Sequence, residues 1–129
     1  MAKQQSIRTP LGKVRGLGSA KHGAGAFIAL RVSSIALLFL VPWFLYSIVG
    51  AVRGGYDGAL DWLSDPINAV LVLIGVGAGL HHMQLGMKEI IEDYIGKKST
   101  KFFLLILNTF FAIVLFAAAV YAVVKVAIA

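Results

Sequence analysis

The chain has 129 residues, of which 59% are hydrophobic and only 14% are charged. Soluble domains carry about a quarter of charged residues, and a chain this small cannot hide so much apolar surface in its own core. This composition excludes an ordinary soluble domain and favours a membrane protein. The absence of cysteine excludes a disulfide framework and a thiolate metal site. Most of the basic residues behind the net charge of +6 lie outside the apolar runs, so membrane topology explains them better than nucleic-acid binding.

Three apolar runs are each long enough for a spanning helix, which needs roughly 20 residues. They cover about residues 26–50, 66–91 and 102–124. We therefore predict an all-α integral membrane protein with three transmembrane helices. A basic arm at residues 1–25 is expected to precede the three-helix transmembrane domain at 26–129.

The distribution of charge predicts how the helices are oriented in the membrane. Basic residues gather in the arm and in the loop at 92–101, whereas the loop at 51–65 has Arg53 against three aspartates. The basic residues of the arm and loop are Lys3, Arg8, Lys13, Arg15, Lys21, Lys97, Lys98 and Lys101. Cytoplasmic loops carry an excess of Lys and Arg, so the N-terminus is predicted to be cytoplasmic. Trp43, Tyr46 and Trp62 then fit an aromatic belt at the outer interface.

The second run contains a stripe of glycines and one of two adjacent histidines. With 100° per residue and Gly75 at 0°, Gly79 and Gly86 lie at about 40° and 20°. His82 lies on the same stripe at about −20°, whereas His81 lies at about −120°. The two histidines therefore point in different directions.

Two interpretations of this stripe remain open. Small residues in membrane helices let another helix approach closely, and His82 would then hydrogen-bond across to a neighbour. Alternatively, a large flat group such as haem lies against the glycines, with His82 as an axial ligand of its iron. His81 would face another helix or lipid, and His22 would lie at the interface. If the iron has two histidine ligands, the second must come from another chain, in a hetero-oligomer or a homodimer.

Asp93 falls back on the glycine stripe, at about 0°, and Tyr94 follows it at the predicted cytoplasmic surface. A tyrosine hydroxyl can donate to a carbonyl, and a neighbouring carboxylate can orient it, which would suit a quinone. The alternatives are an interfacial anchor for Tyr94 and a helix-end or salt-bridge role for Asp93. Arg31, inside the first run, would either snorkel to the interface or pair with an anion such as a haem propionate.

Two segments resemble a known family. The arm "RTPLGKVRGLGSAKHG" (8–23) resembles that of the succinate dehydrogenase hydrophobic membrane-anchor subunits (complex II) of the alphaproteobacterial type. The segment "HMQLGMKEIIEDYIGK" (82–97) resembles that family's H-x3-G-x6-D-Y motif, with His82, Gly86, Asp93 and Tyr94 at the matching positions. The layout of three spans with a cytoplasmic N-terminus is also similar.

The resemblance implies roles for these residues. His82 would be an axial ligand of a haem b shared with the partner anchor, the succinate dehydrogenase cytochrome b subunit. Tyr94 would bind ubiquinone with Asp93 beside it, and Arg31 would lie near the haem propionates and the quinone pocket. Gly75, Gly79 and Gly86 would be the points of close approach to the haem.

The function implied is that of a membrane anchor of succinate:ubiquinone oxidoreductase in the bacterial inner membrane, surrounded by lipid. It would dock the flavoprotein and iron–sulfur subunits and take part in electron transport. The chain itself would carry no catalytic residue for dicarboxylate chemistry, because it has no cysteine and no G-x-G-x-x-G loop. The alternatives are an anchor of fumarate reductase that uses menaquinone, and a membrane scaffold without haem.

Overall fold

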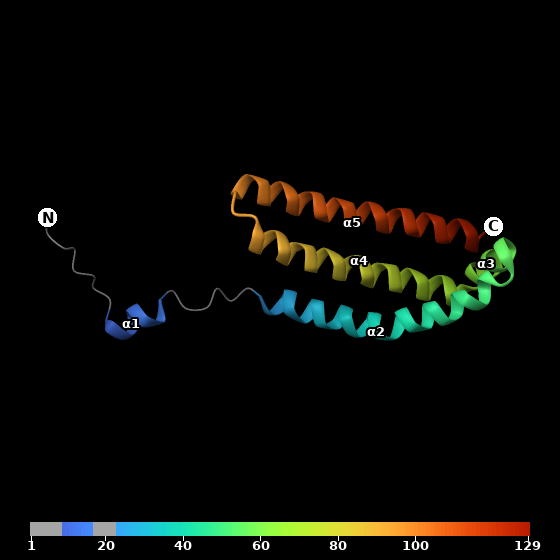
Figure 1. Ribbon diagram of the computed structural model, residues 1–129, viewed down its shortest axis with the longest axis horizontal. Coiled ribbons are helices and arrows are strands. Elements are labelled where there is room, and N and C mark those ends of the chain that lie inside the picture. Colours follow the sequence, from blue (N-terminus) through green and yellow to red (C-terminus); the bar gives the residue numbers. More distant parts are fainter. Residues whose placement is uncertain (1–8, 17–22) are drawn as a thin grey trace.

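The computed structural model describes residues 9–16 and 23–129. Within this part of the chain there are helices and no strands (Figure 1). The helices are α1 (Pro10–Arg15), α2 (Ala24–Val52), α3 (Gly55–Ser64), α4 (Pro66–Tyr94) and α5 (Lys98–Ala127). The predicted all-α class is confirmed.

Three of these helices, α2, α4 and α5, are long and apolar enough to cross a membrane. They have 29, 29 and 30 residues, and at 1.5 Å per residue each is roughly 44 Å long. Since a hydrocarbon core is about 30 Å thick, their ends extend into the interfacial regions. The predicted spans at 26–50, 66–91 and 102–124 lie inside them and are confirmed. The orientation of the N-terminus stays a prediction.

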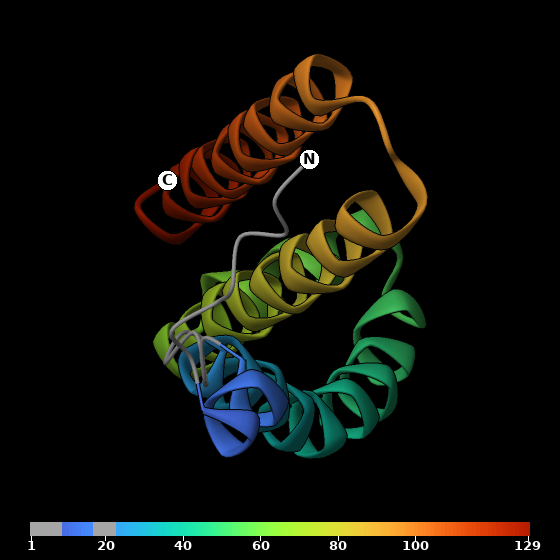
Figure 2. The ribbon, with the colours of Figure 1, turned by 90° about the vertical axis from the view of Figure 1, so that its left-hand side faces the viewer.

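Helix α4 lies in the middle, with α2 against one side and α5 against the other (Figures 1 and 2). The start of α2, the end of α4 and the start of α5 share one end of the molecule (Figure 1). At the opposite end α3 contacts all three long helices. The sequence predicts a loop at residues 51–65, whereas most of this segment is the amphipathic helix α3.

Local sequence explains where α4 begins and why α2 bends. Asp65 precedes α4, and its carboxylate accepts hydrogen bonds from the backbone N–H groups of Ile67 and Asn68. Pro66 occupies the first helical position, where its missing N–H costs nothing. Pro42 lies inside α2, where its ring removes one helical hydrogen bond and bends a helix; α2 is visibly curved (Figure 1).

The chain alone has almost no core. Among the described residues only a few are buried, and they are Ser33, Ala69, Ile91, Ala112 and Val123. Large apolar side chains instead cover the outside of all three long helices. A surface of this kind fits contact with lipid and with partner membrane helices.

The basic arm lies mostly outside the described residues, and so does His22. What is described of the arm is α1, whose start is capped by Thr9: its hydroxyl accepts a hydrogen bond of 3.0 Å from the backbone N–H of Gly12. This helix does not pack on the long helices (Figure 1). The division into an arm at 1–25 and a transmembrane domain at 26–129 stays a prediction.

Candidate functional site

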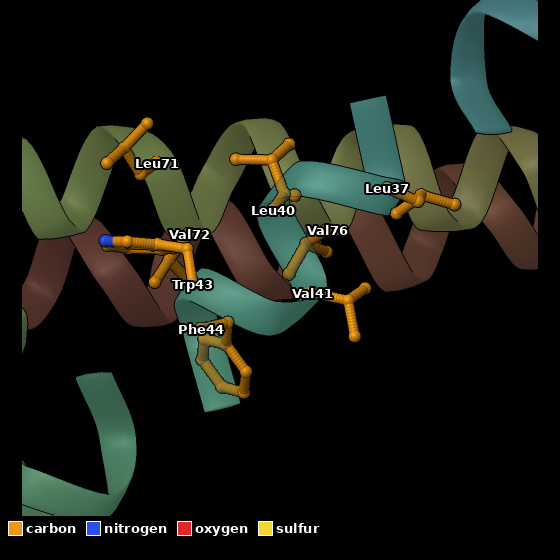
Figure 3. Close-up of a pocket in the computed structure, with 9 residues that line it drawn as sticks. Leu37, Leu40, Val41, Trp43, Phe44, Leu71, Val72 and Val76 are labelled. Carbon is orange, nitrogen blue, oxygen red and sulfur yellow. The ribbon is translucent and has the colours of Figure 1, made fainter. Parts of the chain in front are cut away.

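A cavity of about 190 Å³ lies between α2 and α4 near Pro42 (Figure 3). Its walls are almost entirely apolar, and they are formed by Leu37, Leu40, Val41, Trp43, Phe44, Leu71, Val72, Gly75 and Val76. None of these side chains can transfer a proton or bind a metal. The candidate site therefore lies elsewhere, in the half of α4 that carries His82 and ends at Tyr94.

His82 is half-buried and faces α2. Its Nδ1 lies 3.0 Å from the hydroxyl oxygen of Ser33, which is only 6% exposed. The Ser33 hydroxyl also lies 3.0 Å from the carbonyl oxygen of Leu30 in the preceding turn. The other ring nitrogen, Nε2, has no hydrogen-bond partner among the described residues. Because no fully buried side-chain nitrogen in that part of the chain lacks a partner, Nε2 is not completely enclosed by the chain.

The glycine stripe of α4 also faces α2 over part of its length. A Cβ placed on Gly79 would lie 3.8 Å from Cδ2 of Leu37, and one on Gly75 would lie 4.0 Å from Cβ of Leu40. These are ordinary van der Waals distances, so the two glycines lie in the α2–α4 packing interface, where an added methyl group would also fit. A Cβ on Gly86 would meet nothing within 4 Å. Close approach of a haem at the three glycines stays a prediction, and Gly86 has the most open surroundings.

Asp93 and Tyr94 lie at the end of α4, and both are exposed. Tyr94 is the last residue of the helix and is 82% exposed. At 1.5 Å per residue, twelve residues separate Tyr94 from His82 by about 18 Å along the helix. The structure therefore presents two separate locations on α4, an imidazole deep in the span and a carboxylate–phenol pair at its end.

Basic side chains organise the turn that follows. Lys101 of α5 donates a hydrogen bond of 2.7 Å from Nζ to the carbonyl oxygen of Glu92, one of the last carbonyls of α4. Lys88 lies 3.8 Å from the Glu92 carboxylate, and both side chains are half exposed. Among the described residues this is the one ion pair, so the salt bridge considered for Asp93 with Lys97 or Lys98 is not formed there.

Arg31 is exposed on α2, and its guanidinium carbon lies 5.0 Å from the centre of the Phe27 ring. This is a cation–π distance, and Phe27 lies one turn nearer the start of the helix. Two residues separate Arg31 from Ser33, so the two side chains point about 160° apart. Within this chain, Arg31 and His82 are therefore not in contact. The Arg31 side chain is directed toward the start of α2, which agrees with snorkelling to the interface. Contact with a haem propionate or a quinone stays a prediction.

The set of donor atoms bears on which cofactor this chain could hold. In the described part of the chain, no group of three or more His, Asp or Glu side chains could surround a metal ion. His82, with Nδ1 engaged by Ser33 and Nε2 without a partner among the described residues, instead suits a prosthetic group that supplies most of the iron's ligands itself. His82 would therefore fit one ligand position of a haem iron.

The family model for the succinate dehydrogenase/fumarate reductase transmembrane subunit matches residues 5–124 of this chain. The chain belongs to this family. The succinate dehydrogenase hydrophobic membrane anchor subunit of Rickettsia bellii (strain RML369-C) is 32% identical, over 91% of this chain and 94% of its own. The anchor subunit of Rickettsia conorii (strain ATCC VR-613 / Malish 7) is 34% identical, over 79% of this chain and 82% of its own. That of Paracoccus denitrificans is 31% identical, over 91% and 90% respectively. No solved structure matches the chain.

Membership of the succinate dehydrogenase/fumarate reductase family confirms the resemblance inferred from the two segments. Its homologues are subunits of an oxidoreductase complex, and they are membrane anchors by name. Together with three apolar helices, this makes the chain a multi-pass protein of the bacterial inner membrane.

Two hydrogen bonds between α4 and α5 were not predicted from the sequence. The side-chain amide of Asn108 donates to the backbone carbonyl of Gln84 at 2.9 Å, and the Gln84 amide donates to the hydroxyl of Thr109 at 3.1 Å. These bonds join α4 to α5 beside His81, which is exposed. Their signal was available, because polar residues inside apolar helices commonly bond to a neighbouring helix.

Ser33 was also missed, although it makes the contact with His82. It stands beside Ser34 in an apolar run, and nothing local distinguishes the two hydroxyls. The rotation of α2 against α4 decides which serine reaches the imidazole, and that rotation depends on tertiary packing.

Proposed function

We propose that this chain is the membrane-anchor subunit of a succinate:ubiquinone oxidoreductase. The observation that carries the proposal is His82, which stands at the family motif's position with Nδ1 held by Ser33 and Nε2 without a partner among the described residues. In this proposal His82 would hold the iron of a haem b through Nε2, and the second ligand would come from a partner anchor subunit. The haem, when bound, supplies a site that accepts and releases one electron at a time.

The end of α4 would form part of the quinone site. The Tyr94 hydroxyl would donate a hydrogen bond to a quinone carbonyl, and the Asp93 carboxylate beside it would orient the phenol or accept a proton. Both side chains are exposed in the single chain, so another subunit or the quinone itself can cover them. Their position at the membrane surface would let protons arrive from water.

Docking of the soluble subunits is proposed at the same end. The described part of the chain places exposed Lys97 and Lys98 there, beside the end of α4 (Figure 1). The opposite end carries Asp57, Asp61 and Asp65. Positive charge gathers on the cytoplasmic side of membrane proteins, so this distribution supports a cytoplasmic position for the flavoprotein and iron–sulfur subunits. Dicarboxylate chemistry would take place on those subunits.

A haem-free anchor is the second candidate. The contacts of Gly75 and Gly79 with α2 favour it, because α2 already occupies the space beside these two glycines. A fumarate reductase anchor is a third, since the family description includes both enzymes. The curated relatives compared above carry the succinate dehydrogenase name, which favours the first candidate.

Affinity purification of the tagged chain from its native membrane tests the proposal. We expect a flavoprotein, an iron–sulfur protein and a second anchor to copurify, with succinate-dependent quinone reduction and the absorbance of a b-type haem. An active complex without haem absorbance would favour the second candidate. Purification of the chain without any soluble subunit would overturn the anchor function.

A further inference from the structure

We propose that Ser33 is the positioning residue of His82, and that its hydroxyl accepts a hydrogen bond from Nδ1–H so that Nε2 is the nitrogen that binds iron. This inference rests on the proposed function. It adds to it the reason why Nε2 is the ligating nitrogen and a residue on α2 that orients the ring.

The Ser33 hydroxyl contacts two polar atoms. Its oxygen lies 3.0 Å from His82 Nδ1 and 3.0 Å from the carbonyl oxygen of Leu30. A hydroxyl has one proton to donate and can accept two hydrogen bonds. It can therefore donate to only one of these two atoms, and the choice determines the tautomer of His82.

If the proton points to the Leu30 carbonyl, Ser33 has lone pairs free, and His82 must donate its proton from Nδ1. Nε2 then carries a lone pair. If the Ser33 proton points to Nδ1, the imidazole proton lies on Nε2, and neither nitrogen has a free lone pair. Metal ligation requires a lone pair, and Nδ1 is already engaged with Ser33. Only the first arrangement is compatible with His82 as an iron ligand.

The surroundings of Ser33 support this arrangement. The residue is only 6% exposed, so its hydroxyl has little contact with anything outside the chain. Its position on α2 lets the serine bond back to the carbonyl three residues earlier, as hydroxyls commonly do in helices. The same carbonyl lies 2.7 Å from the hydroxyl of Ser34, which is exposed and makes no contact with His82. Ser34 is therefore a matched control: it has the same side chain and the same acceptor but no link to the imidazole.

Outer partners of metal-bound histidines fix the ring orientation and raise the basicity of the ligand, and their loss commonly costs 10- to 100-fold in affinity. A neutral hydroxyl is a weaker acceptor than a carboxylate, so we expect about a tenfold loss of haem affinity in Ser33→Ala. A less basic imidazole stabilises ferric iron less, so the midpoint potential of the haem should rise.

The experiment uses four variants of the intact complex, each with one substitution. They are Ser33→Ala, Ser34→Ala, Ser33→Thr and Ser33→Val, and the last two introduce side chains of the same shape. Haem content, the redox midpoint potential and the electron paramagnetic resonance spectrum of the ferric haem are measured. We expect lower haem content, a higher potential and an altered spectrum in Ser33→Ala and Ser33→Val. Ser34→Ala should match the unmodified complex. Because Thr and Val have the same shape, recovery in Ser33→Thr alone would assign the effect to the hydroxyl.

Three results would overturn different parts of the account. If Ser33→Ala and Ser33→Val match the unmodified complex while His82→Ala loses the haem, Ser33 does not position the ligand and the proposed function stands. If Ser33→Thr and Ser33→Val are equally impaired, the effect is steric and the hydrogen bond has no such role. If His82→Ala retains an unaltered haem, the ligand assignment within the proposed function is wrong.

Discussion

His81 and His82 are consecutive residues of α4, yet their imidazoles lie in different surroundings. Nδ1 of His82 is 3.0 Å from the Ser33 hydroxyl, and the ring is half-buried against α2. His81 is exposed and lines a groove between α4 and α5 with Gln84, Asn108 and Thr109. The helical angle of about 100° between neighbours is the cause of this difference.

This difference predicts that only one histidine carries the haem. We expect His82→Ala to abolish most of the b-type absorbance of the purified complex, because no other imidazole of the described chain can replace it at that position. His81→Ala should leave the absorbance and the midpoint potential unchanged. The measurement is the reduced-minus-oxidised spectrum per mole of complex. Equal losses in the two variants would contradict the assignment.

Tyr94 is predicted to act in quinone reduction through its hydroxyl. A hydrogen bond contributes about 0.5–1.5 kcal/mol, so Tyr94→Phe should lower succinate-dependent quinone reduction by about 2- to 10-fold. Succinate oxidation with an artificial acceptor should be unchanged, since that reaction does not need the quinone site.

Tyr46→Phe is the control for this experiment, because Tyr46 is similarly exposed, at 86%, but belongs to the half of α2 away from Tyr94. Normal quinone turnover in Tyr94→Phe would support the interfacial-anchor interpretation. A loss of the same size in Tyr46→Phe would also contradict a specific role for Tyr94.

Hydropathy predicted the three spanning helices because the length and apolarity of a segment are local properties. The short helix α3 was missed for the same reason. Its sequence, "GYDGALDWLS", is too short and too polar to show a spanning pattern, and its two glycines do not favour a helix. This amphipathic helix is stabilised by packing against α2, α4 and α5, which a local sequence pattern does not reveal.

The candidate site was predictable only in part. A helical wheel separates His82 from His81 correctly, because both lie on one regular helix. It cannot show that Leu37 of α2 packs at Gly79, or that Ser33 rather than Ser34 reaches His82. Those contacts depend on how α2 is rotated against α4, which single-helix periodicity does not contain.

Gly86 provides a test of close approach to a group outside the chain. A Cβ there would meet nothing within 4 Å, so the chain alone can accept a larger residue. If a haem lies against this position in the complex, overpacking by Gly86→Val would cost about 1–3 kcal/mol and weaken haem binding by about 5- to 150-fold. Haem content of the purified complex measures this effect.

Gly50→Val is the matched control, since Gly50 is also a helical glycine without neighbours within 4 Å, near the end of α2 away from Gly86. It should retain the haem. A Gly86→Val complex with full haem content would show that no bulky group approaches this glycine.

Lys101 is predicted to hold the end of α4 in the position that the quinone site requires. Its Nζ donates to the carbonyl oxygen of Glu92 at 2.7 Å, and the last carbonyls of a helix otherwise lack partners within the helix. A cation there also interacts favourably with the negative end of the helix dipole. Without it the last turn, which carries Asp93 and Tyr94, should fray.

We therefore expect Lys101→Met to raise the KM for ubiquinone several-fold, since a loss of about 1 kcal/mol corresponds to about fivefold. The rate with an artificial acceptor should not change. Lys98→Met removes a neighbouring exposed cation that makes no side-chain hydrogen bond within the described residues, and Lys101→Arg keeps the charge. A KM that rises equally in Lys98→Met and Lys101→Met would show that net charge at this surface matters, and that the bond to Glu92 does not.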